Sequence, residues 1–158
     1  MKFFIEQIAL NPPDARAAMD LLSQLGLSAW TDDVVTATGT VRGKQATTRA
    51  ELHFNYEASP LEGKPLELEV LQYQEGKNWM QRNPASVSHL GMHCTLRELL
   101  QWKEKFKECG IEIVQEVFTD SHTNPAIAET RRYQYVIFGT RDVLGVDLKL
   151  IVRFNVDS

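Results

Sequence analysis

Apolar and polar positions along the chain follow the same succession of patterns twice. Residues 3–26 contain a short apolar run, a turn with two prolines, and apolar positions at helical spacing that end at Gly26. Residues 86–113 repeat this succession, with a capping-box pattern from Thr95 to Glu98 and a stop at Gly110. In this repeat, the segment QIAL aligns with HLGM. Each half of the chain therefore predicts a strand followed by an amphipathic helix.

Strand patterns follow each predicted helix. They are AELHFNY and PLELEVLQY in the first half, and RRYQYVIFG and VDLKLIVRF in the second. A weaker strand pattern precedes each pair, near residues 34–40 and 111–118. Each half then reads β-α-β-β-β, which predicts an α+β protein. We expect a single domain over residues 1–158 with module one at 1–75 and module two at 86–158, joined by the turn-rich segment GKNWMQRNPAS.

Composition narrows the class of protein. A chain of 158 residues is large enough for one core. The net charge is −4, and Lys and Arg are scattered, which argues against a nucleic-acid partner. No apolar run reaches the length of a membrane span, and Glu6 and Gln7 interrupt the N-terminal run that a signal peptide needs. Because Cys94 and Cys109 lack metal-type spacing, we expect reduced thiols in a cytoplasmic protein.

Alternation along the predicted strands collects polar side chains on one face of the sheet. In PLELEVLQY, two glutamates alternate with apolar residues, and in VDLKLIVRF an aspartate and a lysine do so. The two histidines of SVSHLGMHC also share a face. If the helices cover the apolar face, the opposite face gathers Gln7, Glu67, Glu69, His89, His93, Asp147 and Lys149. A concave face of this polarity predicts a functional site.

Two such modules, with metal-type residues on their first and last strands, resemble the vicinal oxygen chelate superfamily. This superfamily includes glyoxalase I, extradiol dioxygenases, fosfomycin-resistance enzymes and bleomycin-binding proteins. The motif SHLGMHC is similar to the opening strand of a module and would put His89 at a ligand position. The resemblance implies a curved mixed sheet around a concave cup, with the helices on the outer face. It also implies a homodimer.

The resemblance further implies a divalent metal ion, namely Zn, Ni, Mn or Fe. The implied ligands are Gln7, Glu69 and His89, with Glu67 as the carboxylate in a shifted register. The metal would polarise a substrate oxygen or bound water, while Glu67 or Asp147 transfers a proton. One position departs from the family pattern, because Lys149 stands where most metal-binding members have Glu. Since a protonated amine cannot be a ligand, the cofactor is a divalent ion or none.

A second group of polar residues lies in the segment TDSHTNPAIAETRRYQY, which reads as a long connection before a strand. Long loops in compact domains often carry function, and arginines can clamp an anionic group. The alternative is a solvated loop with a turn at its Asn-Pro pair. The candidate substrate-binding residues are His93, His122, Asn124, Arg131, Arg132, Tyr133 and Lys149. His93 cannot share an ion with His89, because four residues of strand span about 13 Å.

Three functions remain open at this point. The first is a metal-dependent lyase, isomerase or hydrolase that acts on a small oxygenated metabolite, similar to glyoxalase. The second is a metal-free protein that binds a small molecule, of the bleomycin-resistance type, which Lys149 favours. The third is a protein-interaction module without catalysis. A fold does not by itself choose between them.

Overall fold

The computed structural model describes residues 1–75 and 86–156. The first half follows the predicted β-α-β-β-β order, and the second half adds a four-residue helix on either side of its third strand. The first half contains β1 (Gln7–Asn11), α1 (Ala15–Gln24), β2 (Trp30–Val41), β3 (Lys44–Asn55) and β4 (Glu67–Glu75). The second half contains β5 (Ser86–His93), α2 (Leu96–Glu108), β6 (Ile113–His122), α3 (Pro125–Ala128), β7 (Arg131–Phe138), α4 (Arg141–Leu144) and β8 (Asp147–Asn155). The predicted linker falls on 76–85, outside the described residues.

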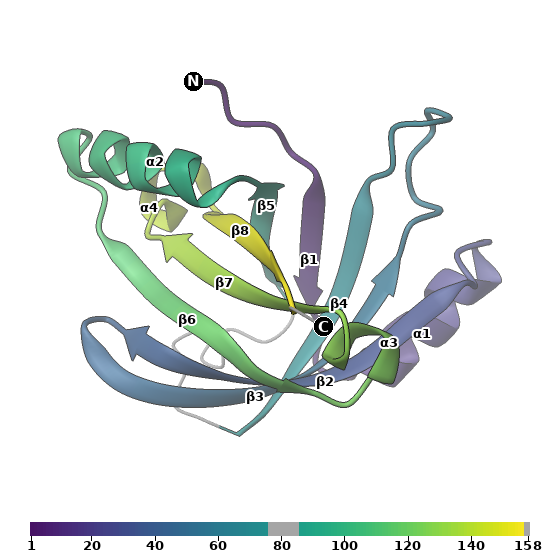
Figure 1. Ribbon diagram of the computed structural model, residues 1–158. Coiled ribbons are helices and arrows are strands. Elements are labelled where there is room, and N and C mark those ends of the chain that lie inside the picture. Colours follow the sequence, from purple (N-terminus) through teal and green to yellow (C-terminus); the bar gives the residue numbers. More distant parts are fainter. Residues whose placement is uncertain (76–85, 157–158) are drawn as a thin grey trace.

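The eight strands form one closed barrel, in the order β1-β4-β3-β2-β6-β7-β8-β5. The two modules meet along two antiparallel seams, β2 with β6 and β1 with β5. Figure 1 shows the strands curving around a common interior, with α1 and α2 on the outside. This architecture confirms the predicted α+β class and the curved sheet with a concave interior.

The parallel strand pairs show the sequence repeat in three dimensions. Gln7 lies opposite Glu67 between β1 and β4, and His89 lies opposite Asp147 between β5 and β8. The alignment of QIAL with HLGM therefore extends to the last strand of each module. Consequently Lys149 occupies the position in module two that Glu69 occupies in module one.

Helix α2 covers the outer face of β5, β7 and β8. Its N-terminus has the predicted capping box, in which the Thr95 hydroxyl accepts from the Glu98 N–H and the Glu98 carboxylate accepts from the Thr95 N–H. Its buried side chains are Leu99, Trp102 and Phe106. Leu96 and Leu100, the other leucines of this helix, are 47% and 57% exposed. The buried stripe instead follows the i, i+3, i+7 spacing, so Trp102 packs in the core.

The prediction of a long loop before β7 was wrong. Strand β6 continues to His122, α3 follows almost at once, and β7 begins at Arg131. Asn124 is the N-cap of α3, and its side-chain oxygen accepts from the Ala126 N–H at 3.1 Å. In the sequence the segment TDSH resembles a loop because it is polar. Its residues are polar because they end a barrel strand, where side chains face the mouth or the outer surface of the barrel.

Cys94 is partly buried and Cys109 is exposed, and neither is in a disulfide within the described residues. The longest helix has 13 residues. Over the described ranges, no helix is long and apolar enough to cross a lipid bilayer.

Gly39 lies in the seam between the modules, where β2 pairs with β6 at Val117. A Cβ atom at this position would be 2.1 Å from the Glu116 carbonyl oxygen, so the backbone ladder would have to open. We expect Gly39→Ala to lower the free energy of unfolding by about 2 kcal/mol, and Thr40→Ala on the same strand by less than about 1 kcal/mol. Urea unfolding measures both. Equal effects of the two substitutions would contradict a tight seam.

Candidate active site

Four polar side chains from adjacent strands meet inside the barrel: Gln7 on β1, Glu69 on β4, His89 on β5 and Lys149 on β8. We call these four residues the polar layer. All are buried. His89 Nε2 is 2.9 Å from Gln7 Oε1, 3.5 Å from Glu69 Oε2 and 3.3 Å from Lys149 Nζ. Gly91 leaves room for this packing, because a Cβ atom there would lie 2.9 Å from Gln7 Oε1.

His89 is a neutral imidazole at the centre of this layer. The Gln7 amide nitrogen donates to Glu67, so the amide oxygen faces His89 Nε2. The matching tautomer donates from Nε2–H to Gln7 and accepts at Nδ1 from the Ser88 hydroxyl, 3.1 Å away. Burial and the positive charge of Lys149 lower the pKa of His89 to about 4. At neutral pH His89 therefore carries no charge.

The Lys149 ammonium lies between a carboxylate and an aromatic ring. Its Nζ is 4.0 Å from Glu69 Oε2 and 4.2 Å from the centroid of the Tyr135 ring. Burial alone would raise the pKa of Glu69, but the charge of Lys149 and the nearby His89 imidazole lower it below the ordinary value. Glu69 is therefore ionised, and Lys149 balances its charge.

Two cavities lie on either side of this layer, toward opposite ends of the barrel. Cavity 1, where β1, β2, β4 and β7 begin, has about 530 Å³ of empty space, part of it continuous with solvent. Cavity 2 has about 460 Å³ and a largely apolar lining. Glu69, Tyr135 and Lys149 line both cavities. The space of cavity 2 is also partly continuous with solvent.

Cavity 1 brings together most of the predicted site residues. In addition to Gln7, Glu69 and Lys149 of the polar layer, it is lined by Glu67, His93, His122, Arg131 and Tyr133. The Glu67 carboxylate accepts from the Tyr56 hydroxyl at 2.9 Å, in addition to the Gln7 amide. His93 is exposed at the rim. The cavity therefore combines carboxylates, imidazoles and two cations around one space.

Solved structures of other proteins share this architecture. No family model and no curated protein sequence matches the chain. Streptomyces coelicolor methylmalonyl-CoA epimerase in complex with 2-nitronate-propionyl-CoA matches with a TM-score of 0.55 at 15% identity, over 100% of this chain and 99% of that chain. Methylmalonyl-CoA epimerase in complex with methylmalonyl-CoA and NH4+ matches with a TM-score of 0.52 at 14% identity, over 94% and 92% of the two chains. A hypothetical protein from Bacillus halodurans C-125 matches with a TM-score of 0.52 at 12% identity, over 98% and 97%.

This chain has the vicinal oxygen chelate fold. The matches extend over both modules, which confirms the fold that the resemblance implied. At 12–15% identity, the likeness shows the fold and not the substrate.

The vicinal oxygen chelate fold implies a metal ion, and the polar layer does not fit one. Gln7, Glu69 and His89 supply an amide oxygen, a carboxylate oxygen and an imidazole nitrogen, which are suitable ligand types. However, an ion on His89 and Glu69 would share its space with the Lys149 ammonium, which is 3.3 Å and 4.0 Å from the same two atoms. Two like unit charges 4 Å apart repel by about 4 kcal/mol at an effective dielectric constant of about 20. Lys149 thus introduces a positive charge where a fourth ligand would be needed.

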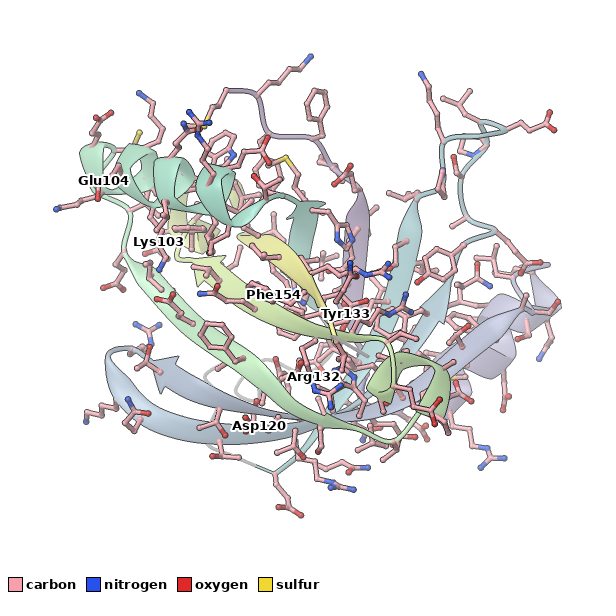
Figure 2. All side chains as sticks on the ribbon, in the orientation of Figure 1. Lys103, Glu104, Asp120, Arg132, Tyr133 and Phe154 are labelled. Carbon is pink, nitrogen blue, oxygen red and sulfur yellow. The ribbon has the colours of Figure 1, made fainter. Side chains whose placement is uncertain are left out.

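Three predicted site residues line neither cavity 1 nor cavity 2: Asp147, Asn124 and Arg132. Asp147 is buried, but its carboxylate accepts from the Arg141 guanidinium at 3.2 Å and the Arg141 N–H at 3.1 Å, and it lines neither cavity. Asn124 caps α3. Arg132 donates to a carbonyl oxygen of α3 at 2.6 Å, and Figure 2 shows it beside that helix. Because side chains alternate along β7, Arg131 faces the cavity and its neighbour does not.

The sequence did not reveal Asp33 or Tyr56 as site residues. Asp33 lies in β2 and accepts a hydrogen bond from His122, 89 residues further along the chain. Tyr56 follows β3 and donates to Glu67. No short motif links such distant positions, because strand pairing alone brings them together. The only local signal was the pair of aspartates in WTDDVV, whose alternation places one of them inside the barrel.

Proposed function

We propose that this protein is an isomerase that moves a proton on a small oxygenated carboxylate bound in cavity 1, and that the Lys149 ammonium stabilises the negative charge in place of a metal ion. The observation that carries this proposal is the position of Lys149 Nζ, 3.3 Å from His89 Nε2, in a cavity that also contains Glu67. The epimerase names of the fold neighbours support the reaction class.

A buried cation has a definite task in such a reaction. Removal of a proton from the carbon next to a carbonyl group leaves negative charge on the oxygen, and a fixed ammonium stabilises that charge. Lys149 lines cavity 1, and Glu69 and the Tyr135 ring hold its ammonium in place. Arg131 brings a second positive charge to the same cavity, suited to a carboxylate of the substrate.

Glu67 is the proposed base. Its carboxylate lines cavity 1, and hydrogen bonds from the Gln7 amide and the Tyr56 hydroxyl orient it. A positioned carboxylate can remove a proton from carbon when the developing charge is stabilised nearby. Asp147, the other candidate base, does not compete for this role because its carboxylate is bound to Arg141 outside the cavity.

Glu67→Gln is expected to lower the rate of proton exchange by roughly 10²- to 10⁴-fold, because the amide cannot accept the proton. Chelator-treated protein is incubated in D₂O with methylmalonyl-CoA, the ligand named for a fold neighbour, and with 2-methyl and 2-hydroxy acids. Proton NMR then follows the C2–H signal. Glu62→Gln, in an exposed loop, is the matched control. Exchange at equal rates in both variants would contradict a role for Glu67.

A second candidate is a metal-free binding protein, and cavity 2 favours it. Apolar side chains of β2, β3, β4, β6 and β7 line this space behind the polar layer. Proton transfer in cavity 1 does not require such a second space. A ligand that fills both cavities would be held without turnover. In that case calorimetry detects binding, and no compound exchanges its C2–H with the wild-type protein or with Glu67→Gln. The homodimer and the cytoplasmic location stay predictions.

A further inference from the structure

His122 and Asp33 form a buried acid–base pair in the wall of cavity 1. His122 ends β6, and its Nδ1 is 2.6 Å from Asp33 Oδ2 on the neighbouring strand β2. Both side chains are 1% exposed. The backbone N–H groups of Thr123 and Asn124 donate to Asp33 Oδ1 at 2.9 and 3.0 Å. The pair is therefore held rigidly by two elements of the fold.

The charge of Asp33 sets the orientation of the imidazole protons. Burial alone would raise the pKa of Asp33, but hydrogen bonds from His122, Asn124 and Thr123 lower it below the ordinary value. An ionised Asp33 accepts the proton of His122 Nδ1–H. In the neutral imidazole this leaves the lone pair on Nε2.

His122 Nε2 is buried and, within the described parts of the chain, makes no hydrogen bond, although His122 lines cavity 1. Arg131 Nε is in the same condition and belongs to the same cavity. A buried polar atom without a partner costs free energy unless a ligand or water satisfies it. Glu69 Oε2 is a third such atom of this cavity, and Lys149 Nζ balances its charge from 4.0 Å. The atoms of His122 and Arg131 indicate a ligand with an oxyanion for Arg131 and a proton to exchange with His122.

We infer that His122 is a second catalytic residue of cavity 1, that Asp33 is its positioning residue, and that Arg131 binds the carboxylate of the substrate. This inference rests on the proposed isomerase function. Glu67 and His122 lie on strands three positions apart in the eight-stranded barrel, at the same end of it, and so approach the cavity from different sides. In one direction Glu67 removes a proton as a carboxylate, and His122, protonated on both ring nitrogens and stabilised by Asp33, gives its Nε2 proton to the same carbon, which leaves Glu67 protonated and His122 neutral. In the other direction the neutral His122 accepts the proton on Nε2 and the protonated Glu67 returns one. Proton exchange with water restores the starting pair between turnovers, so protons and charge balance.

The chain provides a matched control pair. His53 Nδ1 is 2.7 Å from Asp32 Oδ1, and the His53 side chain is 8% exposed. However, His53 and Asp32 line neither cavity 1 nor cavity 2, and the Asp32 side chain is 67% exposed. Both pairs place a histidine Nδ1 beside an aspartate, but His53 Nε2 lies 3.3 Å from Glu51 Oε1 and has no access to the proposed substrate.

Kinetics test the catalytic role. His122→Gln and Asp33→Asn are expected to lower kcat by roughly 10²- to 10⁴-fold with little change in KM, and His122→Gln removes one titration from the pH profile of kcat/KM. The charged and titratable groups around His122 are Asp33 from β2 and Arg131 and Tyr133 from β7. His53→Gln and Asp32→Asn should stay within about twofold of wild type. Equal losses in the two pairs, or an unchanged pH profile in His122→Gln, overturn the inference.

Binding tests the site without turnover. Malonate is the probe, and the imidazole nitrogens are followed by ¹⁵N NMR. Malonate is expected to shift the His122 Nε2 signal and not that of His53, and Arg131→Met is expected to abolish the shift. If malonate shifts His122 while no compound shows proton exchange, the isomerase function fails and the oxyanion site stands. If malonate shifts neither histidine, or shifts both alike, the site itself is wrong.

Discussion

Lys149→Glu is expected to convert the polar layer into a metal site. The substitution removes the ammonium and places a carboxylate at the position equivalent to Glu69 in the repeat. Two carboxylates, the His89 imidazole and the Gln7 amide oxygen then surround one point, a donor set suited to Zn, Ni or Mn. After dialysis against each ion, mass spectrometry should find about one ion per chain in the variant and no stoichiometric metal in the wild type.

Two further variants separate charge from coordination. Lys149→Met removes the positive charge and keeps the length of the side chain, but it adds no strong ligand, so we expect no stoichiometric uptake. Lys149→Glu combined with His89→Ala should also lose the ion. If the wild-type protein binds metal and loses it in Glu69→Ala and His89→Ala, then Lys149 does not exclude the ion. That result would restore the metal-dependent reaction expected from the sequence.

His89 is expected to reduce the stability of the fold as the pH falls from 6.5 to about 4. The pKa of His89 is lowered from 6.5 to about 4 by burial and by Lys149. Between these values the unfolded chain binds a proton that the folded chain does not, so the free energy of unfolding decreases as the pH falls and rises again with pH. The shift corresponds to roughly 3 kcal/mol.

Urea unfolding at a series of pH values measures this effect. His89→Gln removes the titrating group, and its stability should fall by roughly 3 kcal/mol less than that of the wild type over the same interval. His93→Gln, an exposed position at the end of the same strand, should keep the wild-type dependence. Glu69, with its lowered pKa, adds a loss at lower pH in all three proteins. An unchanged slope in His89→Gln would contradict a buried neutral imidazole.

Local patterns predicted most of the fold and the interior face of the barrel. Helix α2 appeared from its apolar spacing and capping box, and the strands PLELEVLQY and VDLKLIVRF from alternation. Alternation also placed Glu67, Glu69 and Lys149 on the interior face, where the structure has them. These features depend on neighbours within about seven residues, which is the range over which sequence patterns act.

Local patterns could not predict the contacts that depend on the pairing of distant strands. The polar segment before β7 read as a loop, although barrel pairing makes its first part a strand. Asp147 shares the alternation of Lys149, but Arg141 from the adjacent helix α4 binds its carboxylate. The pairing of Asp33 with His122 depends on the register of β2 against β6.

The sequence by itself determined the repeated β-α-β-β-β order, the outer and inner faces of the strands, and the presence of a lysine in a set of metal-type residues. Only the tertiary structure decided that Lys149 Nζ lies 3.3 Å from His89 and that His122 has a buried partner. The physical reason is that strand period and helix spacing are local properties of the chain. Distances across a barrel depend on register and closure, and these are set by the packing of all eight strands together.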